Sequence, residues 1–184
     1  PIGVMADHMH KKGESMISLR ISYMKMKGNA LDGNSISDGE ILDIDNPHSN
    51  SSAKLSVVPI EMSMKMLMLG GMYAPSDDIT LMFMTMFMDK SMNLNTYHAM
   101  MRNNIGSFNS SSSDLSDLSF SALVKINEQD KNRWHAEIGL KFSVGEKKEK
   151  GKVLTPMNTN METILPYGMQ SGDDSFGLVV GFTN

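Results

Sequence analysis

Methionine residues spaced two apart most limit what this chain can fold into. Twenty of its 184 residues are methionine. Many alternate with other residues in two runs, Met62 to Met68 and Met82 to Met88, and Met24 and Met26 form a shorter run. In a β-strand a spacing of two keeps side chains on one face, whereas in a helix it scatters them around the axis. The runs therefore predict strands with a row of thioethers along one face.

Apolar and polar residues alternate in six segments, which predicts six β-strands. In the first, Ile17, Leu19 and Ile21 fall on one face, and Ser18 and Arg20 fall on the other. The predicted strands span about residues 14–27, 60–73, 79–89, 114–126, 134–144 and 174–182. Long connections are expected at 28–59, 90–113 and 145–173, and short turns at 74–78 and 127–132.

This order of strands and connections is typical of one class of protein. Long strands, long loops at one end and tight turns at the other indicate an antiparallel up-and-down transmembrane β-barrel of the outer-membrane type. A soluble β-sandwich or a lipocalin-like barrel would give the same alternation, because periodicity does not say which face meets water. Strand length and loop asymmetry favour the membrane barrel.

Composition excludes several classes of function. Acidic and basic residues are interspersed and the net charge is −4, so no basic surface for nucleic acid is expected. The absence of cysteine excludes disulfides, thiolate metal sites and a cysteine nucleophile. The sequence contains no apolar run of about eighteen residues that would predict a transmembrane helix. No phosphate loop, zinc signature or nucleophile elbow is present, so we do not expect an enzyme.

Charged residues within the strands predict which face lines the lumen. In a membrane barrel the apolar face meets lipid and the polar face meets water. We therefore expect a lumenal network of ion pairs, rather than a catalytic set, from Arg20, Lys65, Asp117, Glu137 and Lys141.

The two methionine runs are predicted to face opposite sides of this wall. Glu61, Ser63 and Lys65 alternate with Met62 to Met68, which would place these methionines toward lipid. Apolar residues alternate with Met82 to Met88, which would place that run toward the lumen. Lumenal thioethers could pass Cu(I), Ag(I) or an apolar solute, although methionine is also a flexible apolar filler.

The roles of two further groups of residues are predicted from their positions along the chain. Tyr23, Tyr73 and Trp134 stand near strand ends, where aromatic girdles meet the membrane interface. The best metal candidates are His8, Met9 and His10, because imidazole and thioether together suit copper. They do not make a complete coordination sphere, and the alternative is a polar N-terminal segment that tucks under or into the barrel. No other cofactor is expected.

Five collinear stretches carry a resemblance: residues 1–14, 22–26 with 28–29, 61–64, 71–77 and 165–172. They resemble a family of bacterial outer-membrane proteins described as transporters, or as the MetA-pathway of phenol degradation family. The opening stretch and the Met-Tyr-Ala-Pro turn are its most specific parts. The resemblance implies a β-barrel in the outer membrane of a Gram-negative bacterium, with the N-terminus on the periplasmic side.

The chain departs from that family in length. Family members look longer, and six strands fall short of the eight at which single-chain outer-membrane barrels begin. An open sheet would leave two unpaired edges in lipid. We therefore expect about six strands of a larger barrel, closed by further strands or by other copies in an oligomer.

These observations predict a domain organisation and a function. Residues 1–13 would form a periplasmic segment and residues 14–184 the barrel domain. The expected function is a transporter or channel for a small solute, apolar or aromatic in character, with membrane lipid and lipopolysaccharide as partners. The alternatives are a copper-binding outer-membrane protein that uses its Met and His residues, and a structural barrel in a larger envelope assembly.

Overall fold

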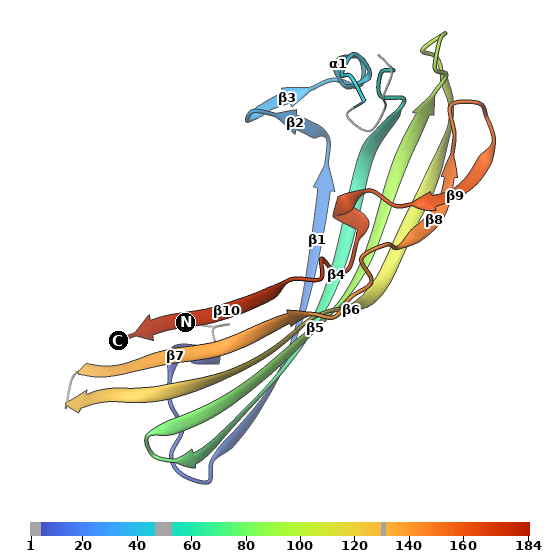
Figure 1. The fold of residues 1–184 in the computed structure, drawn as a ribbon. Coiled ribbons are helices and arrows are strands. Elements are labelled where there is room, and N and C mark those ends of the chain that lie inside the picture. Colours follow the sequence, from blue (N-terminus) through green and yellow to red (C-terminus); the bar gives the residue numbers. More distant parts are fainter. Residues whose placement is uncertain (1–4, 47–52, 130–131) are drawn as a thin grey trace.

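One antiparallel sheet forms the body of the molecule (Figure 1). The computed structural model describes residues 5–46, 53–129 and 132–184. Six strands pair in the order β1-β4-β5-β6-β7-β10. Their bounds are β1 Ser15–Lys27, β4 Val57–Ser76, β5 Ile79–Tyr97, β6 Asn104–Gln129, β7 Asn132–Ser143 and β10 Phe176–Thr183. The prediction of an all-β antiparallel sheet with long strands is confirmed. The sheet is not closed into a barrel, since β1 and β10 do not pair in the described part of the chain.

The central strands are longer than the sequence predicts. β4, β5 and β6 contain 20, 19 and 26 residues. The expected long connection at 90–113 is wrong, because β5 continues to Tyr97 and β6 begins at Asn104. Serine and asparagine occupy the outward positions there and bond across the strands. Asn109 Nδ2, for example, donates to Asn93 Oδ1 at 2.8 Å. The outward positions are polar, so the apolar alternation that marks the other strands is missing.

The other long connections carry small elements. The first contains a hairpin of β2 (Asn29–Leu31) and β3 (Asn34–Ile36), followed by the single α-helix of the described residues, α1 (Asp38–Leu42). The last contains a second hairpin, β8 (Lys150–Leu154) and β9 (Asn160–Ile164), and a short 3-10 helix, η2 (Tyr167–Met169). The two hairpins and α1 lie toward the end of the sheet opposite the tight β4–β5 turn, whereas η2 lies against β5 (Figure 1). None of the helices in the described ranges is long and apolar enough to cross a membrane.

The register places the methionine runs of three strands on one face. Met24 pairs with Met64, and Met66 pairs with Met88, so their side chains share a face. The methionines on this face are Met16, Met24, Met26, Met62, Met64, Met66, Met68, Met72, Met82, Met84, Met86, Met88 and Met92. The prediction that the two long runs face opposite sides is therefore wrong. The polar residues opposite the first run belong to the outward polar surface beyond the apolar part of the sheet.

The face that carries these methionines is concave. One pocket on it is lined by Arg20 of β1 and by Val179 of β10, which are the two edge strands, so the sheet curls until its edges approach over this face. Two small apolar clusters lie on the concave face. One contains Met72, Met82 and Leu123. The other contains Met92, Leu94, Leu165 and Met169.

Candidate functional site

A band of exposed apolar side chains covers the outer face of the sheet, opposite the methionines. Its members alternate with concave-face residues on all six strands. Ile17 is 82% exposed and Phe182 is 70% exposed. The band comprises Ile17, Leu19, Ile21, Leu67, Leu69, Ile79, Leu81, Phe87, Leu115, Phe120, Val124, Ile138, Leu140, Phe142, Phe176, Leu178, Val180 and Phe182. Nothing in the described ranges covers this apolar band.

The apolar band ends at a defined level across the central strands. The strand register places Leu67, Phe87 and Leu115 side by side in one outward row. The next outward row consists of Lys65, Asp89 and Ser113. Beyond that row most outward side chains are polar and several bond to one another, whereas Val58, which pairs with Asn95, packs against Ile41 and Leu42. Ser107 Oγ donates to Asn95 Oδ1 at 2.7 Å, and Lys25 Nζ lies 2.9 Å from Glu61 Oε1. The outer face is thus divided into an apolar half and a polar half.

Large aromatic side chains stand at both limits of the apolar band. Tyr23 pairs with Lys65 at the polar limit. Tyr73 and Trp134 stand near the opposite limit, where Tyr73 pairs with Ser15 at the start of β1 and Trp134 pairs with Asn127. All three are exposed. Their role as interfacial girdle residues stays a prediction.

The position of Lys65 corrects one sequence-based expectation. Lys65 pairs with Tyr23 on the outer face, whereas Arg20 pairs with Met68 on the concave face. The expectation that Lys65 lines the same surface as the other four charged candidates is therefore wrong. It assumed that every polar residue of β4 points inward, but the outer face is itself polar at this level.

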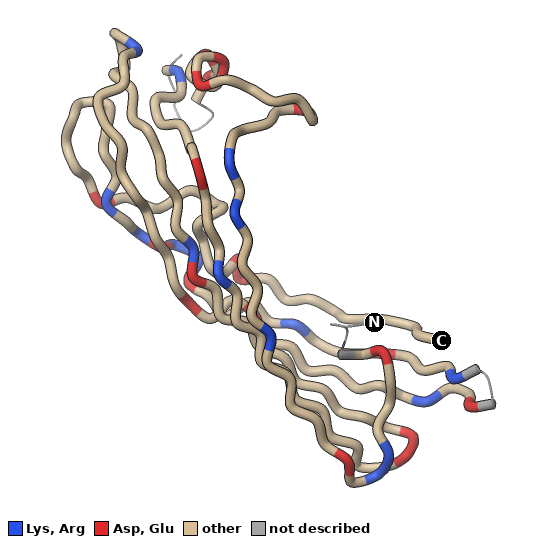
Figure 2. The backbone as a smooth tube through the Cα atoms, turned by 180° about the vertical axis from the view of Figure 1, so that it is seen from behind, with Lys and Arg blue, Asp and Glu red and all other residues tan. Residues whose placement is uncertain are grey.

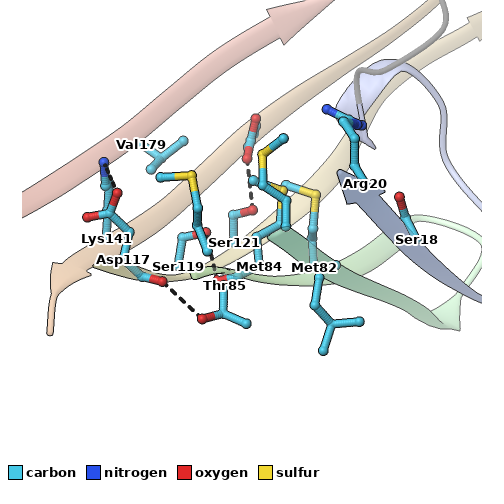
Figure 3. Close-up of a pocket in the computed structure, with 15 residues that line it drawn as sticks. Ser18, Arg20, Met82, Met84, Thr85, Asp117, Ser119, Ser121, Lys141 and Val179 are labelled. Carbon is cyan, nitrogen blue, oxygen red and sulfur yellow. Dashed lines mark hydrogen bonds and ion pairs between the residues drawn. The ribbon is translucent and has the colours of Figure 1, made fainter. Parts of the chain in front are cut away.

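A pocket of about 270 Å³ lies on the concave face (Figure 3). It gathers the four remaining charged candidates above a floor of methionine side chains. The lining residues are Ser18, Arg20, Met68, Leu69, Gly70, Met82, Met84, Thr85, Met86, Asp117, Ser119, Ser121, Glu137, Lys141 and Val179. They come from all six strands of the sheet, so the curl of the whole sheet forms the pocket.

The charged groups of the pocket are only partly paired. Lys141 Nζ lies 3.1 Å from Asp117 Oδ2, and Ser121 Oγ donates to Glu137 Oε1 at 2.8 Å. Arg20 makes no ion pair or hydrogen bond to another side chain within the described residues, and it extends along the rim of the pocket in Figure 3. The pocket therefore offers one unpaired guanidinium, one carboxylate held by a hydroxyl, and several thioethers.

The last long connection folds onto the concave face at the level where the outer face is polar, which the sequence did not predict. Lys90 Nζ, from a residue that is 6% exposed, donates to the carbonyl oxygens of Gly168 (3.2 Å) and Gln170 (2.6 Å). Ser112 Oγ donates to the carbonyl of Met169 at 2.6 Å. Met169 itself is fully buried. A clue is present in the sequence, since Lys90 interrupts a run of alternating methionines with a charge.

The N-terminal segment covers the other end of the concave face. His135 Nε2 bonds to the carbonyl of Ala6 at 2.8 Å, and the backbone N–H of His10 donates to Thr80 Oγ1 at 3.2 Å. Met9 packs against the cluster of Met72 and Met82. Residues 1–4, part of the predicted periplasmic segment, lie outside the described residues.

Of the three predicted copper ligands, the structure brings His8 and His10 together, with their ring centroids 4.9 Å apart, whereas Met9 packs against the cluster of Met72 and Met82. His8 is half exposed, and its Nδ1 lies 2.5 Å from Asp7 Oδ1. This hydrogen bond lowers the pKa of Asp7. The described part of the chain places no group of three or more His, Asp or Glu side chains around a common metal position. Copper binding by His8, Met9 and His10 stays a prediction.

Comparison with known proteins leaves the sequence-based resemblance untested. No protein-family model, no curated protein and no solved structure matches this chain. The functional conclusion must therefore come from the two faces of the sheet.

Proposed function

We propose that this chain forms the wall of a bacterial outer-membrane β-barrel and lines a path for a small solute. The apolar band supports this proposal most directly. Soluble monomers rarely expose a continuous apolar patch of more than a few hundred Å², whereas here apolar side chains stand outward on all six strands. Lipid would cover a surface of this extent, because a barrel presents alternate residues to the hydrocarbon on every strand.

The length of the apolar band along the strands supports a lipid bilayer, rather than a protein partner, as what covers it. A tilted transmembrane strand needs about 9–11 residues to cross the hydrocarbon. On β5 the band runs from Ile79 to Phe87, about nine residues, the low end of that range. Aromatic residues stand at both limits, as in the girdles of known barrels. The longer part of each central strand then projects into water, which suits its outward Asn and Ser residues.

Lysines at the polar limit of the apolar band fit an anionic lipid surface. Lys65 occupies the first polar row, and Lys27 and Lys25, of which Lys25 is paired with Glu61, follow Tyr23 on the same face of β1. Amines at this level can reach headgroup phosphates while their aliphatic stems lie along the apolar surface. In the outer leaflet those phosphates belong to lipopolysaccharide, which we propose as the partner of this surface.

The edges of the sheet require closure in the membrane. β1 and β10 each present one row of backbone N–H and C=O groups without a strand partner in the described residues. In hydrocarbon such groups cost several kcal/mol each, so open edges are not tolerated. We propose that further strands or other copies of the chain complete the barrel around the concave face.

The pocket supports a proposal about the kind of solute. Four methionines and Val179 give its lining apolar surface beside eight polar or charged residues, and Arg20 leaves one cationic group unpaired. A small molecule with an apolar or aromatic body would rest on the methionines. The scale of the pocket suits a solute of few heavy atoms rather than a polymer.

Solute flux through the protein in lipid vesicles tests the transport role. Ser119 lines the pocket, and its neighbour Phe120 belongs to the apolar band. Ser119→Trp should lower single-channel conductance or solute flux severalfold, because the ring fills the path. Phe120→Trp is the matched control and should leave both unchanged. A wild-type protein that inserts and passes neither current nor solute contradicts the transport role and favours a structural barrel.

A further inference from the structure

We propose that the thioether cluster beneath the N-terminal segment binds a soft monovalent cation, Cu(I) or Ag(I). Five methionines pack together there: Met9, Met16, Met72, Met82 and Met84. They come from the N-terminal segment and from β1, β4 and β5. This site is distinct from the predicted set of His8, Met9 and His10, because its sulfurs belong mainly to the sheet.

The sheet register explains how the cluster forms. Met16 pairs with Met72, and Met72 pairs with Met82, so three thioethers form one row across three adjacent strands. Side chains in directly opposed positions have Cβ atoms about 5 Å apart. Met84 is two residues beyond Met82 on the same face, and Met9 packs onto the row from above. Flexible thioether side chains at this spacing can turn several sulfurs toward one ion.

Chemical softness would select the ion. Thioether ligands favour Cu(I) over harder divalent cations. The adjoining pocket contains two cationic side chains, Arg20 and Lys141, and two anionic ones, Asp117 and Glu137. The local charge therefore gives no general preference for cations. A site of neutral sulfur ligands in such surroundings selects among cations by their preference for sulfur, and not by their charge.

An unpaired imidazole nitrogen lies close to the cluster along the chain. His10 directly follows Met9, its side chain is 13% exposed, and its Nε2 is buried without a hydrogen-bond partner in the described residues. Buried polar atoms usually have a partner. The backbone N–H of His10 bonds to Thr80, two residues before Met82 on the same strand. We therefore count this nitrogen, whose ring also contacts His8, as a candidate further ligand for the same ion.

The cluster also has a route of access. Met72 and Met82 are only 3% and 8% exposed, but Met82 and Met84 line the concave pocket as well as the cluster. An ion in the pocket therefore reaches the cluster without separating the N-terminal segment from the sheet. Cation binding of this kind does not depend on whether the barrel passes a solute.

Titration of the purified full chain with Ag(I) tests the proposal, with Cu(I) added under reducing conditions in competition with a colorimetric chelator. We expect about one tightly held ion per chain. Met72→Leu with Met82→Leu should weaken binding at least tenfold, since leucine conserves volume but lacks sulfur. X-ray absorption of the Cu(I) form should show sulfur scatterers. His10→Phe should remove any nitrogen scatterer.

Two control variants separate this site from unspecific thioether binding. Met66→Leu with Met88→Leu removes another cross-strand pair of the concave face, and Met100→Leu removes an exposed loop methionine. Both should bind the ion as the wild type does. Absence of retained Ag(I) and Cu(I) in the wild type overturns the proposal. Equal losses for the 72/82 and 66/88 pairs also overturn it, because they would show a dispersed methionine surface instead of a site.

Discussion

The outward-facing residues of this sheet fall into two environments, and the row in which a residue lies decides which one it has. In the rows up to Leu67, Phe87 and Leu115 most outward side chains are apolar, and from Lys65, Asp89 and Ser113 onward most are polar. The alternation of Ile17 and Leu19 with Ser18 predicts the two faces of β1 correctly. Lys65 could not be placed in this way, because periodicity tells which residues share a face and not what that face meets.

A charge introduced into the apolar band should be far more costly than one beyond it. Ile138 stands near the middle of the band on β7, and Ser111 stands outward in the polar half of β6. Ile138→Arg should lower the free energy of unfolding in lipid vesicles by about 2–4 kcal/mol, the cost of arginine near the bilayer midplane. Ser111→Arg should change it by less than about 0.5 kcal/mol. Denaturant titration measures both, and equal effects would contradict the assignment of the band to lipid.

At the scale of elements, the sequence predicts those strands whose two faces differ in polarity. It predicts β1 and β10 nearly to their ends. It misses the polar halves of β5 and β6, where outward Asn and Ser residues resemble a loop in composition. It also misses the docking of η2, because Lys90 contacts the carbonyls of Gly168 and Gln170 across about eighty residues of sequence.

Lys90 should hold the last long connection on the concave face. Lys90→Met removes the donor from two carbonyl oxygens, each of which then loses a hydrogen bond worth about 1 kcal/mol or more. We expect faster hydrogen exchange and proteolysis in residues 165–172, with the sheet unchanged. Ser111→Ala, on the outer face, is the control and should leave the connection protected. Unchanged protection in Lys90→Met would show that apolar packing of Leu165 and Met169 suffices.

The capping box of α1 should weaken in acid. Glu40 Oε2 accepts hydrogen bonds from Ser37 Oγ at 2.7 Å and from the Ser37 backbone N–H at 2.8 Å. These bonds lower the pKa of Glu40. Since the folded-state pKa is below the unfolded one, the stabilisation is complete above the unfolded value, about 4.3, and is lost as the pH falls through the folded value.

Hydrogen exchange of the Ser37 amide measures this effect. Between pH 7 and pH 3 its protection, corrected for intrinsic exchange, should fall in the wild type. Glu40→Gln keeps an acceptor but does not titrate in this range, so its protection should not depend on pH. The same fall in both proteins would assign the loss to another group.

At the scale of the whole molecule, the sheet combines an open topology with two unlike faces. The concave face is partly covered by the N-terminal segment and by the last long connection, whereas the apolar band is bare in the described ranges (Figures 1 and 2). Figure 2 shows few charged residues along the half of the sheet that carries the band, apart from those near its turns. In the function that we propose, lipid covers the band and strand partners satisfy both edges.

Cysteine accessibility in lipid vesicles tests the central claim most directly, because the chain contains no native cysteine. Three single variants sample the relevant surfaces: Ile21→Cys in the apolar band, Ser22→Cys on the concave face, and Asn93→Cys in the outward polar half. A membrane-impermeant maleimide should label Ser22→Cys and Asn93→Cys, and should label Ile21→Cys only after denaturation. Labelling of Ile21→Cys in intact vesicles at the rate of Asn93→Cys would show that the apolar band does not lie in the bilayer.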